Sequence, residues 1–333
     1  MTTRSRLWLL LAALALGALS IAGAQAQTYP SRAITMVVPF APGGLTDVPA
    51  RLLAALLQEK IGQNIVVENK TGGSGVVGGT FAVRAAPDGY TLFANSVADT
   101  QNLHYIPVPY SAVNDFAMIG FVVEGPPLVM IVDAKLPYKT VAEMVADAKA
   151  NPNKLSFGTS GPASSPVIAL TQLNQAAGTQ IVGVPYRGSG EAARAVAGSG
   201  AIQGAFAFYS QAKPLADDGK VRALAVASPQ RIATWAGVPT FEELGYKNFD
   251  HRGFVGLAVP AKTPKAIIEF LQKNLIEVVQ TERFKKPMLE LGMTVPAAAN
   301  NTPEKFAEFM RVQTERQAAF AKLVGAPPVQ QPR

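Results

Sequence analysis

Short apolar runs alternate with helix-like segments along most of the chain, and this alternation predicts an α/β protein. Apolar, β-prone runs lie at 34–38, 64–68 and 90–95. Between them, at 48–60 and 75–86, apolar residues recur at helical spacing. Strands that alternate with helices favour a mostly parallel sheet covered by helices on both faces.

A second series of the same kind follows. It predicts strands at 154–158, 180–185, 201–206, 221–227 and 253–259, and helices at 140–150, 164–177, 189–197, 210–217, 263–279, 282–291 and 302–324. Gly125-Pro126-Pro127 separates apolar runs at 116–123 and 128–132. We interpret this break as the crossing between two lobes.

The first 26 residues have the three parts of a secretory signal peptide. Arg4 and Arg6 form a positive start, 7–21 is an apolar run, and Ala24-Gln25-Ala26 is a small-x-small cleavage site. We expect cleavage after Ala26 and an exported, soluble mature protein. The sequence has no cysteine, which excludes an anchor on an N-terminal Cys, thiolate catalysis and Cys-ligated metals.

The composition suits a protein of two domains that binds a small anion. The 333 residues are 48% hydrophobic and 16% charged, with a net charge of +7. Removal of Arg4 and Arg6 leaves 30 − 2 = 28 basic against 23 acidic residues, or +5. No basic run is interleaved with aromatics, so we expect no nucleic-acid partner.

The first strand runs into a glycine loop and a helix, an arrangement that favours an anion. Phe40-Ala-Pro-Gly-Gly-Leu is followed by Thr46, a candidate N-cap for a helix that starts at Asp47. Free backbone N–H groups and a helix dipole then meet at one place. The stretch 154–165 has the same strand–turn–helix form. Two such loops, one in each lobe, predict a clamp around a small ligand.

Other motifs offer weaker alternatives. The G-x-G-x-x-G match at 73–78 does not directly follow its strand, so we interpret it as a glycine-rich loop and not a dinucleotide site. His104 and His251 are the only histidines and lack metal or hydrolase spacing. We expect both in surface or loop positions, and we predict no metal or cofactor. An exported hydrolase would need a nucleophile–base pair, and no motif supplies one.

The opening block, Tyr29-Pro-Ser-Arg-Ala-Ile-Thr-Met-Val-Val-Pro-Phe-Ala-Pro-Gly-Gly-Leu-Thr-Asp47, resembles the start of the Bug (TctC) family, the periplasmic solute receptors of tripartite tricarboxylate transporters. The likeness continues through five later blocks: Val184-Pro-Tyr-Arg-Gly188, 219–228, Val238-Pro-Thr-Phe-Glu-Glu-Leu-Gly245, 256–264 and Thr302-Pro-Glu-Lys-Phe306. It therefore spans essentially the whole mature chain, with every block in order.

The resemblance implies a two-lobed periplasmic-binding-protein fold of type II. Lobe 1 would comprise 27–124 and 252–333, and lobe 2 would comprise 125–251. The family holds a ligand carboxylate with main-chain N–H groups and waters, which places the ligand at Pro42–Asp47 and Thr159–Ser165. It implies a monomer that delivers its ligand to membrane permease subunits. A receptor of the same fold that docks on a sensor kinase is the alternative.

Three positions depart from the usual family pattern. Leu45 replaces a loop glycine, Val167 replaces a histidine, and Phe208-Tyr209 replaces a Phe-Asp pair. The missing acid argues against an amino-acid ligand, whose ammonium needs a carboxylate. Di- and tricarboxylates and aromatic acids remain, and Leu45 and Phe208 favour an apolar or aromatic body.

Several residues keep two interpretations. Phe40 is either core or stacked on the ligand, and Arg187 either binds a carboxylate or faces solvent. Asp47 more plausibly secures its loop than touches the ligand, and it pairs with Arg51 on a helix surface. Asn95 and Ser96 end the third strand, where side chains reach a cleft. The predicted ligand-binding residues are Phe40, Pro42, Gly43, Gly44, Leu45, Thr46, Asp47, Asn95, Ser96, Thr159, Ser160, Gly161, Ser164, Ser165, Arg187 and Phe208.

Overall fold

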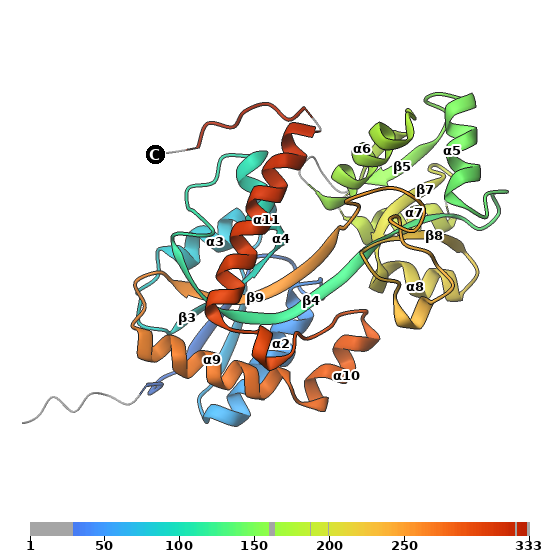
Figure 1. Cartoon of the computed structure of the whole chain (residues 1–333). Coiled ribbons are helices and arrows are strands. Elements are labelled where there is room, and N and C mark those ends of the chain that lie inside the picture. Colours follow the sequence, from blue (N-terminus) through green and yellow to red (C-terminus); the bar gives the residue numbers. More distant parts are fainter. Residues whose placement is uncertain (1–28, 160–163, 187, 199, 324, 332–333) are drawn as a thin grey trace, which may run out of the picture.

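Two α/β lobes share one strongly curved mixed sheet in the computed structural model of the chain (Figure 1). The structure describes residues 29–159, 164–186, 188–198, 200–323 and 325–331. The predicted signal peptide therefore lies outside the described residues. The strand order is β2-β1-β3-β9-β4-β7-β5-β6, and β8 also pairs with β4.

The elements follow the predicted alternation. The strands are β1 (Ile34–Val38), β2 (Ile65–Asn69), β3 (Thr91–Ser96), β4 (Phe116–Asp133), β5 (Ser156–Thr159), β6 (Val182–Pro185), β7 (Gly204–Phe208), β8 (Val221–Ala227) and β9 (Arg252–Pro260). The helices are α2 (Asp47–Ile61), α3 (Val76–Val83), α4 (Val97–Gln101), α5 (Val141–Ala150), α6 (Ser165–Ala177), α7 (Ser189–Gly198), α8 (Tyr209–Asp217), α9 (Lys265–Val279), α10 (Glu282–Glu290) and α11 (Pro303–Leu323).

Lobe 1 is built on β1, β2 and β3, which run parallel, and on β9, which lies antiparallel between β3 and β4. One face of this sheet packs on α2, α9 and α10 around Leu53, Leu275 and Phe284. The other face packs on α3, α4 and α11 around Phe93 and Phe306. The helices that follow the second lobe in sequence therefore complete the first.

Lobe 2 repeats the arrangement with β5, β6 and β7 in parallel. The second half of β4 pairs antiparallel with β7 and β8. Phe157 and Phe206 centre the core beneath α5 and α6, and Val196 lies in the core beneath α7 and α8. The expected parallel order thus holds for the outer strands, while β4 and β9 make the whole sheet mixed.

The break expected at Gly125-Pro126-Pro127 is wrong, because β4 runs through it as one strand of 18 residues. Its first half pairs with β9 and its second half with β7 and β8. The register with β9 shifts between Glu124 and Pro127, so the prolines stand where the ladder is already irregular. A Cβ on Gly125 would lie 2.7 Å from the carbonyl carbon of Gly253, so the two strands approach closely here. The residue limits of the lobes remain a prediction.

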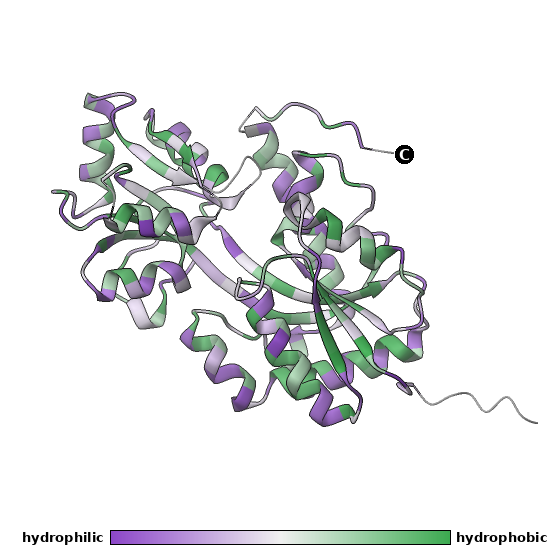
Figure 2. Cartoon of the chain, turned by 180° about the vertical axis from the view of Figure 1, so that it is seen from behind, coloured by the Kyte–Doolittle hydropathy of each residue, from purple (hydrophilic) through white to green (hydrophobic). Residues whose placement is uncertain are grey.

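Sequence periodicity also missed α4, a helix of five residues directly after β3. It is too short to show an apolar repeat. The helix expected at 75–86 is shorter, because Gly73–Gly75 forms a 3₁₀ turn with Ser74 in a left-handed conformation before α3 begins. Hydrophobic residues follow the strands and hydrophilic residues gather on loops and outer helix turns (Figure 2). Among the described helices, none is long and apolar enough to cross a membrane.

Candidate functional site

The loop between β1 and α2 is held by Asp47, the first residue of α2. Its Oδ2 accepts the N–H of Gly43 at 2.8 Å and the Nε–H of Arg51 at 2.8 Å. Its Oδ1 accepts Asn69 Nδ2 at 2.7 Å, and the same amide donates to the carbonyl of Phe40. Both carboxylate oxygens are thereby committed to the loop, which supports the securing role predicted for this residue.

Two local expectations for this loop are wrong. Thr46 occupies the N-cap position but makes no side-chain cap hydrogen bond, because its backbone is already helical (φ −87°, ψ −34°). The Asp47–Arg51 pair is not a surface pair, because Asp47 is 1% exposed. Burial would raise the pKa of Asp47, but hydrogen bonds from Arg51, Asn69 and Gly43 outweigh it and hold the pKa below its usual range.

The loop before α3 lies against the first loop. A Cβ on Gly75 would stand 3.2 Å from Phe40 Cζ, so Phe40 packs on the glycine turn. Asn102 donates to the carbonyl of Ser74 at 2.8 Å. Phe40 is thus half-buried against the glycine turn, and its contact with a ligand stays a prediction.

The end of β3 carries Asn95 and Ser96, both 2% exposed. Asn95 Nδ2 points at the sulfurs of Met118 and Met310, at 3.5 and 3.9 Å, on the α11 face of the sheet. The N–H of Ser96 donates to Asp99 Oδ2 at 2.8 Å, and Tyr110 donates to Asp99 Oδ1 at 3.0 Å. Ser96 Oγ and Asn95 Oδ1 are buried without a hydrogen-bond partner among the described residues.

Asp99 is predicted to make stability depend on pH. Burial raises its pKa from 3.8 to about 6, although hydrogen bonds from Ser96 and Tyr110 oppose the rise. Between about pH 4 and 6 the folded carboxyl keeps a proton that the unfolded chain releases. The contribution of Asp99 to stability therefore falls as the pH rises through this window, by roughly 3 kcal/mol. The measurement is urea unfolding from pH 4 to 7.

The control is Asp99→Asn, which keeps the shape and cannot ionise. Its stability relative to the native protein is expected to grow from pH 4 to pH 7. His251 moves stability the other way, because burial lowers its pKa to about 3, but this effect is common to both proteins and cancels. Parallel pH profiles for the two proteins would contradict the assignment.

The second loop leads into α6 of lobe 2. Thr159, at the end of β5, is 5% exposed and its Oγ1 donates to the carbonyl of Val184 at 3.3 Å. Ser164 occupies the N-cap position of α6 and Ser165 is its first residue. Ser160, Gly161 and Arg187 lie outside the described residues, so their predicted roles stay predictions.

Sequence analysis missed two glutamines, one that bonds across the lobes and one that ties two helices of lobe 2. Gln101, at the end of α4 in lobe 1, donates through Nε2 to Ser165 Oγ in lobe 2 at 3.1 Å. Gln211 Oε1 accepts from Ser189 Oγ at 2.7 Å and from the N–H of Phe208 at 3.3 Å, and so ties together the first turns of α7 and α8. Isolated glutamines carry no sequence pattern that would have marked them.

Leu45 and Phe208 approach one another at the strand that links the lobes. A Cβ on Gly253 of β9 would lie 2.9 Å from Leu45 Cδ2 and 3.7 Å from Phe208 Cε1. Both side chains are half-buried. The first loop, the end of β7 and β9 thus converge around two apolar groups.

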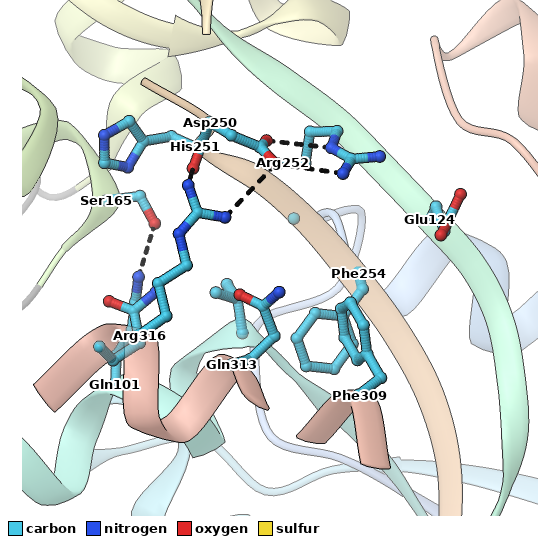
Figure 3. Close-up of a pocket in the computed structure, with 13 residues that line it drawn as sticks. Gln101, Glu124, Ser165, Asp250, His251, Arg252, Phe254, Phe309, Gln313 and Arg316 are labelled. Atoms are coloured by element: carbon cyan, nitrogen blue, oxygen red, sulfur yellow. Dashed lines mark hydrogen bonds and ion pairs between the residues drawn. The ribbon is translucent and has the colours of Figure 1, made fainter. Parts of the chain in front are cut away.

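A pocket on the α11 side of the same strand is lined by charged and amide groups (Figure 3). Arg252 donates to both oxygens of Asp250, at 3.0 and 3.1 Å. Arg316 of α11 donates to the carbonyl of Asp250 at 2.9 Å. Burial would raise the pKa of Asp250, but Arg252 and Arg316 hold it below its usual range. Arg316 thus fastens α11 to the segment that enters β9, within which Arg252 pairs with Asp250.

His251 lies in the loop that leads into β9, as expected, but it is buried at 5% exposure, so a surface position for it is wrong. Its ring makes a 2.8 Å hydrogen bond to Gln172 of α6 and stacks on Phe320 of α11. His104 is half-buried, and its Nε2 lies 2.9 Å from the carbonyl of Thr314. Neither histidine lies in a cluster suited to a metal ion, and among the described residues no such cluster occurs.

Comparison with known proteins places this architecture in a family. Residues 49–325 match the family described as "Tripartite tricarboxylate transporter family receptor". BugT from Bordetella pertussis is 33% identical over 305 residues, which cover 90% of this chain and 92% of BugT.

Two solved structures from R. palustris share the fold over whole chains. One, solved with adipate, is 26% identical with a TM-score of 0.81 and covers 91% of this chain and 100% of its own. The other, MatC with bound malate, is 27% identical with a TM-score of 0.78 and covers 88% of this chain and 100% of its own. The chain belongs to the TctC family of tripartite tricarboxylate transporter receptors.

Proposed function

We propose that the protein is a periplasmic receptor that captures an organic carboxylate between its lobes. The observation that carries the proposal is the braced loop before α2. Asp47 fixes Gly43 in a left-handed conformation (φ +77°) at the start of a helix of 15 residues. Main-chain N–H groups and the positive end of the helix dipole at this place suit a carboxylate.

The relatives support the same ligand class. Solved structures of similar fold contain adipate or malate, and both ligands are dicarboxylates. As a monomeric receptor, the protein would bind the ligand without chemical change and hand it to membrane permease subunits. The comparisons give no support to the alternative partner, a membrane signalling kinase.

The proposal predicts that carboxylates raise the melting temperature of the mature protein. A ligand that binds only the folded form stabilises it by RT ln(1 + [L]/Kd), about 2.7 kcal/mol at a hundredfold excess over Kd. The measurement is a thermal-shift screen of mono-, di- and tricarboxylates and aromatic acids, with amino acids and sugars as the comparison set. A shift with amino acids or sugars and none with any carboxylate would overturn the proposal.

A further inference from the structure

The two half-buried apolar side chains between the lobes come from elements that face each other. Leu45 lies in the loop after β1, and Phe208 ends β7. Both approach the bare backbone of Gly253, at 2.9 and 3.7 Å from the position of a Cβ there. A Cβ at 253 would displace Leu45, while it would only touch Phe208, so the bare backbone of Gly253 leaves room for Leu45 beside Phe208.

Three polar groups near this apolar pair, the N–H of Phe208, the amide oxygen of Gln211 and the carboxylate of Asp47, are already bonded within the protein. The N–H of Phe208 is taken by Gln211 Oε1, and Gln211 also accepts from Ser189. Both oxygens of Asp47 are occupied by Gly43, Arg51 and Asn69. A ligand hydroxyl placed against Leu45 and Phe208 would therefore lose its water without gaining a partner from these groups.

We infer that Leu45 and Phe208 make the receptor select carboxylates whose body is a hydrocarbon over those that carry a hydroxyl. The inference rests on the proposed function, because it takes the loop before α2 as the carboxylate site. Burying an unpaired hydroxyl costs about 1.4–2.7 kcal/mol, which corresponds to roughly 10- to 100-fold in affinity.

Matched ligand pairs that differ by one hydroxyl test this selection directly. Isothermal titration would compare succinate with malate, and phenylacetate with mandelate. The native protein is expected to bind the hydroxyl-free member of at least one pair 10-fold more tightly or better. In Leu45→Ser the ratio is expected to fall towards one, because the serine hydroxyl offers the missing partner.

Leu45→Ile is the control, since it keeps the apolar surface and should keep the ratio. Circular dichroism and thermal melting establish that each variant is folded. A preference below 10-fold for the hydroxyl-free acid in both pairs, an unchanged ratio in Leu45→Ser, or no binding of any of the four acids overturns the inference. If the wider carboxylate panel still gives thermal shifts, only the selectivity fails. If no carboxylate of that panel shifts the melting temperature either, the proposed function fails.

Discussion

Replacing Gly256 by alanine is expected to destabilise the protein by ~3 kcal/mol or more, because the new methyl group has no room. Gly256 lies in the middle of β9, and a Cβ there would stand 1.9 Å from Phe306 Cζ and 2.5 Å from Asn95 Oδ1. Phe306 cannot yield easily, since it is fully buried and its ring lies 4.4 Å from that of Phe121. Urea unfolding at pH 7 measures the loss.

Two further variants make this prediction specific. Gly237→Ala adds the same methyl group where nothing lies within 4 Å, so it should change stability by no more than about 0.5 kcal/mol. Phe306→Leu shortens the opposing side chain. Combined with Gly256→Ala, it should cost less than the sum of the two single changes, since neighbouring substitutions are not additive. If the free-energy changes of the two single variants add strictly in the double variant, the Phe306 ring and the new methyl group at 256 do not clash.

Replacing Asp47 by alanine is expected to lower carboxylate affinity at least 10-fold and to cost about 2–4 kcal/mol of stability. The substitution leaves the N–H of Gly43, the amide of Asn69 and the guanidinium of Arg51 without their shared acceptor. The loop then loses the contact that holds Gly43 in its left-handed conformation. Titration calorimetry with the best ligand of the thermal-shift screen measures the affinity.

Arg51→Ala removes the ion pair with Asp47 but keeps the hydrogen bond from Gly43 to Asp47, so it shows which of the two contacts ligand affinity needs. Arg51 is half-exposed but its partner Asp47 is buried, so the removal of Arg51 should cost stability while it leaves the Gly43 contact intact. Affinity should then stay close to that of the native protein. The pKa of Asp47 is lowered in the folded state, so its contribution is present above about pH 4 and is lost as the pH falls through the folded pKa. Equal affinity loss in both variants would contradict the bracing role.

Much of the architecture follows from local pattern. The strand Ile34–Val38 was predicted at its observed limits, and the helix predicted over 48–60 spans Asp47–Ile61, because an apolar run, two glycines and a proline in the first turn all favour the same structure. The strand Val221–Ala227 was predicted at its limits for the same reason.

The site escaped prediction where it depends on contacts between distant segments. Burial of His251 needs α6 and α11 on either side of it, and neither neighbour is near it in sequence. The bond from Gln101 to Ser165 joins the two lobes across 64 positions. The continuity of β4 through two prolines is imposed by β9 beside it, which overrides the local preference for a break.

The strand order also determines when the first lobe can be finished. β9 lies between β3 and β4 in the sheet, yet Ala258 pairs with Phe93, 258 − 93 = 165 positions earlier in the chain. A chain that emerges N-terminus first therefore completes all strands of the second lobe before the first lobe can close. Pairings this distant in sequence form slowly. Until residues 252–260 arrive, β3 remains an unpaired edge, so chains truncated before this point should be prone to aggregation and to proteolysis.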